Sequence, residues 1–192
     1  MNVLSLVTRS RTGTLVNIIF ELFSDKIKLI EAYEDADMHA KAKDQYHWLL
    51  SPEASIYYGS DVQIDYLKML KSFIICCESF EEDQINQEVQ KRRSRLGAGP
   101  VPQIRTAVES EIVKSSDLEI WYEKLITEAD DKILKQPYKL KLAKRLAAKA
   151  KHITDIETKS RIWALLCETE EEIFDEQLFE IVVDNSDSSR FE

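Results

Sequence analysis

Glycine and proline are scarce in this sequence, with four of each among 192 residues. An all-β sandwich or barrel turns about every 8–12 residues, and its turns depend heavily on these two residue types. The scarcity therefore excludes a fold built from many short strands. Charged residues make up 32% of the chain and are interleaved with leucine, isoleucine and alanine, a pattern that favours amphipathic helices. The sequence predicts an all-α fold.

Long apolar runs and paired cysteines are also lacking. The longest apolar stretch near the start, Leu15–Phe23, is shorter than the roughly 20 residues that a membrane-spanning helix needs. The three cysteines are Cys76, Cys77 and Cys167, an odd number with two neighbours that cannot readily pair with each other. This pattern is typical of a reduced, intracellular protein, so we expect a cytoplasmic location and no membrane partner. The first 20 residues contain arginine but no acid, which leaves a transit peptide as an alternative.

Patterns typical of catalysis and metal binding are absent. His39 and His47 are eight residues apart, too far for the i, i+4 pair of a helical zinc site. The stretch from Asp35 begins like a calcium loop, but Ala40 stands where such a loop requires glycine. The sequence has no phosphate-binding loop, nucleophile elbow or dinucleotide-binding motif. We therefore predict no enzymatic activity, no metal and no cofactor.

A helical hairpin is predicted over Leu15–Leu50. Two apolar stripes at helical spacing flank the polar turn Glu34–Asp37, and so short a connection makes the helices antiparallel. The small Ala42 lets the second helix approach the first closely. The spacing resembles a tetratricopeptide repeat, a 34-residue helical pair that stacks into α-solenoids. Leu29, Tyr33, Ala42 and Tyr46 fit its consensus, whereas Lys26, Ile30, Leu49 and the early Pro52 depart from it.

The rest of the chain continues this helical pattern. A second hairpin is predicted over Asp61–Leu96, broken near Ser79 or Glu82, where a polar cluster could start a new helix. Beyond Gln103 we expect an irregular region of helices, one capped at Ser115–Asp117 and one opened by Pro137. The predicted segments are an N-terminal segment at 1–14, tetratricopeptide-like hairpins at 15–96, a junction at 97–103, a helical continuation at 104–183 and a disordered tail at 184–192.

The most distinctive stretch is a basic one in a chain of net charge −9. It comprises Lys91, Arg92, Arg93 and Arg95, and it ends at Gly97, where a helix can close. Basic side chains in a last turn favour the negative end of the helix dipole, so one interpretation is a well-capped helix end. The other is an exposed partner-binding surface for RNA or an acidic protein.

A second basic cluster runs from Lys139 to Lys151 along the flanks of an apolar stripe. Acidic residues crowd the stretch Glu168–Glu172 shortly afterwards. The cluster is therefore interpreted first as a solvated face neutralised by those acids, and second as a track for RNA.

Several segments resemble the tetratricopeptide scaffold subunit of the fungal superkiller complex. The arginine-to-glycine junction is the most specific of them. The segments are Glu31–Gln45, Tyr66–Phe73, Val89–Pro100, Gln103–Arg105, Glu109–Ile112 and Tyr122–Leu125.

This resemblance implies a non-catalytic scaffold or adaptor that is part of a longer subunit, or a truncated relative of it. That family's protein is an extended superhelix that holds an RNA helicase and WD-repeat subunits together, so that cytoplasmic mRNA is fed 3′ to 5′ into the exosome. The association with RNA would then be indirect. Two alternatives stay open: a single-strand RNA-binding helical module that uses the basic clusters, and an adaptor with a concave peptide groove. Strong salt dependence of RNA binding would distinguish the RNA-binding module.

The hairpin hypothesis makes Ala42 a test residue. Ala42→Trp should lower the free energy of unfolding by about 1–3 kcal/mol, because the larger ring overpacks a close helix crossing. Chemical denaturation measures the change, with Lys41→Ala as a surface control that should shift stability by less than about 0.5 kcal/mol. A neutral Ala42→Trp would show that the repeat register is wrong.

Overall fold

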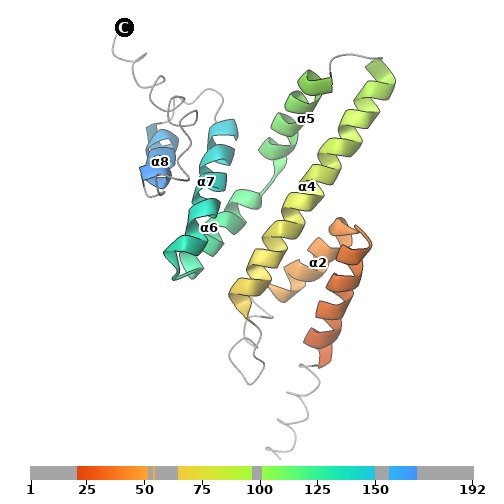
Figure 1. Cartoon of the computed structure of the whole chain (residues 1–192), viewed down its shortest axis with the longest axis vertical. Helices are drawn as coiled ribbons and strands as arrows, with labels where there is room; N and C mark the ends of the chain where they lie inside the picture. The colour runs from red at the N-terminus through yellow and green to blue at the C-terminus, as the bar shows by residue number, and fades with distance from the viewer. Residues whose placement is uncertain (1–20, 52–53, 55–64, 97–100, 150–155, 168–192) are drawn as a thin grey trace, which may run out of the picture. The chain divides into compact units, whose positions relative to one another are not determined.

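The structure is a computed structural model that describes residues 21–51, 54, 65–96, 101–149 and 156–167 (Figure 1). All regular structure among these residues is α-helical, which confirms the predicted fold class at this level. The chain divides into two compact units, unit 1 (Met1–Phe80) and unit 2 (Glu81–Glu192). The boundary lies inside one long helix, α4 (Tyr66–Leu96), which contributes residues to both.

Unit 1 is built from the helix at residues 21–35, α2 (His39–Leu49) and the first half of α4. The first two form an antiparallel pair (Figure 1). Lys26 Nζ donates to Gln45 Oε1 at 2.6 Å, and the rings of Phe23 and Trp48 lie 5.5 Å apart. These contacts join residues early in one helix to residues late in the next, which confirms the first predicted hairpin. Its residues 15–20 lie outside the described part of the chain.

Apolar side chains of all three helices form the core of unit 1. Ala42 is fully buried, as predicted, and the ring of Tyr46 lies 5.6 Å from that of Phe73 on α4. Lys41 Nζ lies 5.6 Å from the centre of the Tyr33 ring, so Lys41→Ala would also remove a cation–π contact. The exposed Asp44 is therefore a better control site for Ala42→Trp. The other buried apolar residues here are Phe23, Ile30, Leu49, Leu50, Ala54, Leu70, Phe73, Ile74, Cys76 and Cys77.

The turn between the first two helices has a defined geometry. Met38 N donates to Tyr33 O at 2.8 Å, and Asp37 N donates to Glu34 O at 3.0 Å. This pair of bonds is the Schellman motif, which requires a left-handed residue at its centre. Asp37 fills that position with φ 53°. Aspartate tolerates the left-handed region better than most residues, because its short polar side chain can bond locally.

Helix α4 contradicts the prediction of a second hairpin over Asp61–Leu96. It runs unbroken for 31 residues, from Tyr66 to Leu96. No glycine or proline occurs in this span, so the backbone has no residue that favours a turn. The polar cluster near Ser79 resembled a helix start, but its acids find partners on other helices of unit 2. The N-terminal cap is Asp65, whose Oδ1 accepts the N–H of Lys68 at 3.1 Å.

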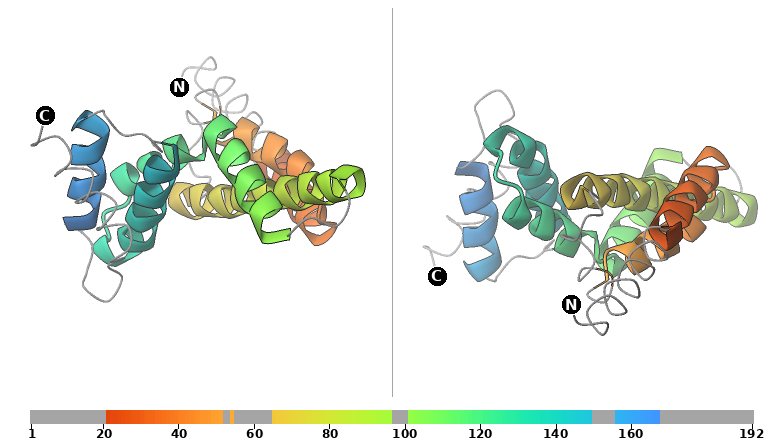
Figure 2. Two further views of the ribbon diagram at one scale, coloured as in Figure 1. Left: turned by 90° about the horizontal axis from the view of Figure 1, so that it is seen from above. Right: turned by 90° about the horizontal axis from the view of Figure 1, so that it is seen from below.

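Among its described residues, unit 2 contains the second half of α4 and four further helices. The pairs are antiparallel: α5 runs back along α4, α7 packs on α6, and α8 packs on α7 (Figure 1). In both views of Figure 2, α8 lies beside α7. One core cluster joins Ile85 and Val89 to Val108, and another joins Ala143 to Ile162 and Leu166. The helices are α5 (Val101–Ser115), α6 (Leu118–Glu128), α7 (Lys132–Lys149) and α8 (Ile156–Cys167).

Two helix starts in unit 2 differ from the sequence prediction. Helix α7 begins at Lys132, so Pro137 lies inside it rather than opening it. Asp131 sets the start, because its Oδ1 accepts the N–H of Ile133 at 2.8 Å. Helix α5 begins at Val101, earlier than the predicted Gln103, and its first turn tolerates proline because N–H groups there have no partner within the helix.

The predicted cap at Ser115–Asp117 agrees with the start of α6 at Leu118. Ser116 Oγ accepts the N–H of Leu118 at 3.2 Å. The glycine-rich part of the junction (97–100) and the predicted tail (184–192) lie outside the described residues.

The left-handed residue in the turn supplies a stability test. Asp37→Val should lower the free energy of unfolding by about 1–2 kcal/mol, because a β-branched side chain is strongly disfavoured at positive φ. Asp37→Gly should be at least as stable as the natural protein, because glycine enters this region without a steric cost. Urea denaturation monitored by circular dichroism measures both. Equal stability of the two variants would contradict the left-handed geometry.

Candidate functional site

The four predicted partner-binding residues lie on the last turns of α4 but do not share one face. Successive residues on a helix are about 100° apart, so only Lys91 and Arg95 point the same way. Lys91, Arg93 and Arg95 are exposed, whereas Arg92 is half-buried. No side-chain hydrogen bond or ion pair joins Arg93 or Arg95 to any residue that the structure describes. The cluster is thus divided between three exposed cations and one that is held against α5.

Arg92 is held by two carboxylates. Its Nη1 and Nη2 fork onto Glu111 of α5 at 3.2 and 2.5 Å, and its Nε donates to Glu88 at 3.1 Å. Lys91 Nζ also donates to Glu88, at 3.0 Å. Because Arg95 is closest to the end of the helix, the sequence alone predicts that Arg95 makes the structural contact while Lys91 and Arg92 stay solvated. For Arg92 the structure contradicts this prediction. The acid that decides this, Glu111, lies 19 residues further along the chain, beyond the reach of a local pattern.

These contacts shift the ionisation of the groups that make them. The hydrogen bonds that Arg92 donates to Glu111 and then to Glu88 raise the pKa of Arg92 above its ordinary value. The hydrogen bond that Arg92 donates lowers the pKa of the Glu111 carboxyl. Hydrogen bonds from Lys91 first, and then from Arg92, lower the pKa of the Glu88 carboxyl. All three groups therefore stay charged across the neutral range, and Arg92 is neutralised within the protein.

A second charged cluster lies deeper in unit 2, and the sequence did not reveal it. Arg145 of α7 donates from Nη1 and Nη2 to Glu81 at 2.7 and 3.0 Å, and from Nε to Glu119 at 3.1 Å. Lys149 Nζ donates to Glu119 at 2.8 Å and to the carbonyl oxygen of Ser116 at 2.7 Å. The Ser116 hydroxyl donates to Glu81. We call these five residues the buried ion network.

The buried ion network is well shielded from water. The side chains of Arg145, Glu81 and Glu119 are 12%, 13% and 9% exposed. Burial acts to lower the pKa of Arg145, but the hydrogen bonds and charge of Glu81 and then Glu119 outweigh it and raise that pKa. Two acids and two bases balance, so no net charge is buried. The hydrogen bonds of the network connect α7 to α4 and to α6. Arg145 and Lys149, which belong to the second basic cluster, therefore have a structural role.

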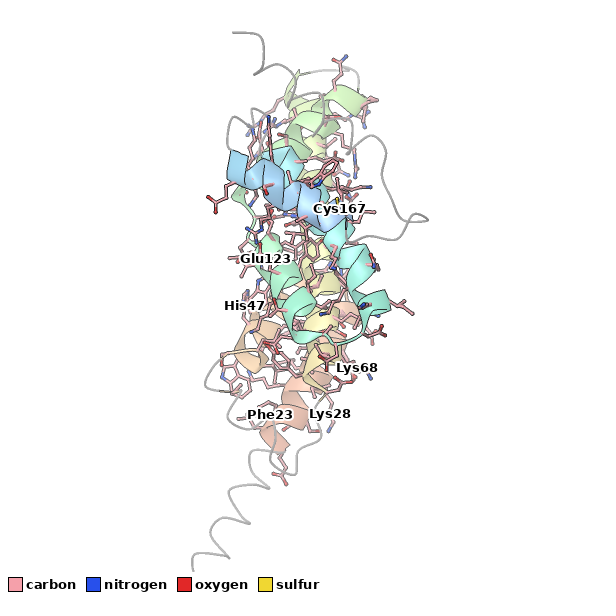
Figure 3. The ribbon with its side chains drawn as sticks, turned by 90° about the vertical axis from the view of Figure 1, so that its left-hand side faces the viewer. Phe23, Lys28, His47, Lys68, Glu123 and Cys167 are labelled. Atoms are coloured by element: carbon pink, nitrogen blue, oxygen red, sulfur yellow. The ribbon has the colours of Figure 1, made fainter. Side chains whose placement is uncertain are left out.

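Unit 1 carries a groove of about 330 Å³ between the helix at residues 21–35 and α4, with Tyr46 of α2 at its base. Figure 3 labels Lys68, which lines it from α4. Both walls carry charged and apolar side chains. We call this the unit 1 groove, and its lining residues are Ile27, Ile30, Glu31, Glu34, Tyr46, Asp65, Lys68, Met69 and Ser72.

The base of the unit 1 groove is fixed by one hydrogen bond. The phenol of Tyr46 donates to Glu34 Oε1 at 3.0 Å. Burial first, and then the charge of Glu34, raise the pKa of Tyr46 well above its ordinary value, so the phenol stays a donor. Burial also raises the pKa of the Cys76 thiol to about 11, and its Sγ lies 3.5 Å from the carbonyl oxygen of His39. This thiol is protonated at neutral pH, which makes it a poor nucleophile.

No group of three potential metal ligands comes together among the described residues. Over the same residues, no helix combines the length and the apolar character that crossing a bilayer requires.

The buried ion network predicts a large effect from a single truncation. Arg145→Ala should lower the free energy of unfolding by about 3–5 kcal/mol, because it leaves two buried carboxylates without their partner. Arg105→Ala is the matched control, since Arg105 also bonds two carboxylates, Glu82 at 2.7 Å and Glu109 at 2.7 Å, but at an exposed site. Its effect should be much smaller, because water screens the charges that remain. Equal losses in urea denaturation would contradict the burial of the network.

Comparison of the chain with protein-family models, with curated proteins and with solved structures finds no match. The resemblance to the superkiller scaffold therefore stays a prediction that rests on the residues quoted for it.

Proposed function

We propose that the chain is a non-catalytic adaptor that binds a partner protein in the unit 1 groove. The observation that supports this proposal is the groove itself, which combines half-buried apolar side chains such as Ile27 and Met69 with charged rims. Its walls come from helices that pack on a shared core. Grooves between helices are a recurrent way of binding peptide segments.

The groove is poorly suited to chemistry. A nucleophile needs an adjacent base to activate it, and among the lining residues that the structure describes the hydroxyl groups belong to Tyr46 and Ser72. The phenol of Tyr46 is a donor to Glu34 rather than an acceptor of a substrate proton. A lining of this kind supports recognition, not turnover.

In its narrower form, the proposal makes the chain part of a superkiller-type scaffold that supports cytoplasmic 3′ to 5′ mRNA decay. The support comes from unit 1, where Ala42 is fully buried at a helix pair and Tyr46 packs beside it, as a tetratricopeptide repeat requires. The unbroken α4 limits this support to one repeat-like pair. Under this hypothesis the partners are an RNA helicase and WD-repeat subunits, and the exposed Lys91, Arg93 and Arg95 offer further contacts on more than one face of α4.

The test is recovery of partners from nuclease-treated extract of the source organism with the purified, tagged chain. We expect a reproducible set of proteins, identified by mass spectrometry, that persists after RNA is removed. A set that lacks a helicase and a WD-repeat protein would overturn the superkiller form and leave the adaptor. Recovery of no protein, together with salt-sensitive binding of single-stranded RNA by the purified chain, would overturn the adaptor in favour of the RNA-binding module.

A further inference from the structure

The unit 1 groove has a marked charge imbalance. Among the lining residues that the structure describes, three carry carboxylates, Glu31 and Glu34 from the helix at residues 21–35 and Asp65 from the start of α4, against one ammonium group, that of Lys68. Glu31 and Asp65 are exposed, so each can meet a ligand without the cost of desolvating a buried charge. An acidic lining of this kind attracts cations and repels phosphate, which excludes nucleic acid as the occupant of this surface.

Apolar surface lies between these charges. Ile27 and Met69 are half-buried lining residues, one from each wall, and Ile30 is buried beneath them. A volume of about 330 Å³ is at the lower end for a small-molecule pocket. Such pockets also depend on a few convergent polar groups below the surface, whereas the buried phenol here is already bonded to Glu34. The exposed charges of Glu31 and Asp65 lie on the rims, where they can meet a chain that passes through the groove.

We propose that the unit 1 groove binds a basic and apolar segment of a partner protein. An arginine or lysine of that segment pairs with Glu31 on the rim, and an apolar side chain next to it packs between Ile27 and Met69. The long stems of arginine and lysine can themselves cover apolar surface while their charged heads stay in water, so the two features of the groove favour the same kind of segment. This proposal specifies the partner chemistry of the adaptor and rests on that function.

The test uses three fluorescein-labelled peptides and fluorescence anisotropy at physiological salt. The probe has the sequence Ser-Gly-Arg-Leu-Ser-Arg-Leu-Gly-Ser, one comparison peptide replaces both arginines with glutamate, and the other replaces both leucines with serine. We expect saturable binding of the probe and at least tenfold weaker binding of both comparison peptides. No saturable binding of the probe, or equal binding of all three, would overturn the proposal.

Variants of the exposed rim locate the binding. Glu31→Lys should weaken binding of the probe at least tenfold, whereas Asp44→Lys, an equal change at an exposed carboxylate of α2 outside the groove, should alter it less than twofold. Circular dichroism should show that both variants are folded, since both sites are exposed. Equally weakened binding of the probe by the two variants would mean that net charge alone controls binding, and it would overturn the proposal that the groove is the binding site.

Repeating the extract experiment with Glu31→Lys separates this inference from the adaptor function. Loss of partners that the natural chain recovers supports the groove chemistry. Recovery of an unchanged set overturns the groove chemistry and leaves the adaptor. If the natural chain recovers no protein and binds single-stranded RNA in a salt-sensitive manner, the adaptor function fails, whatever the peptides show.

Discussion

Unit 2 depends on the pairing of Arg145 with Glu81 and Glu119. The three side chains are each less than about one-seventh exposed, and no one of them could be buried alone without a penalty of several kcal/mol. The charges are all compensated together only when α4, α6 and α7 are in place, because Arg145 of α7 bonds Glu81 of α4 and Glu119 of α6. Lys149 donates to the remaining oxygen of Glu119, Oε2, and the Ser116 hydroxyl adds a further hydrogen bond to Glu81. An ionic network of this kind favours one specific packing, because partial packings leave charges unpaired.

Unit 1 is organised by apolar packing instead. Ala42 allows the close crossing of two helices, and Tyr46 and Phe73 fill the space beside it. Tyr46 also connects the core to the surface, because its hydroxyl bonds to Glu34 in the lining of the groove. The same residue thus contributes to stability and shapes the proposed binding surface. The base of the groove is therefore held by a buried residue, whereas Glu31 and Asp65 on its rims are exposed.

The charges of this protein fall into three environments with different consequences. Buried pairs such as Arg145–Glu81 specify packing, and half-exposed pairs such as Arg92–Glu111 add orientation to α5. Exposed groups such as Glu31 and Arg95 lie at the surface, where water screens their charge. A cluster of cations in the sequence does not by itself define a binding surface, because folding assigns some of its members to internal acids.

The sequence by itself determined the all-α class, the first hairpin with its turn and the burial of Ala42. These features depend on periodicity, small residues and turn chemistry, which act over a few neighbouring residues. Only the tertiary structure decided that α4 continues past Ser79, that Pro137 lies within α7, and that the cations of both basic clusters are divided between structure and surface. Arg145 and Glu81 are 64 residues apart, and no local pattern encodes their contact. Their pairing follows from helix packing, which buries both charges and makes each the partner that the other requires.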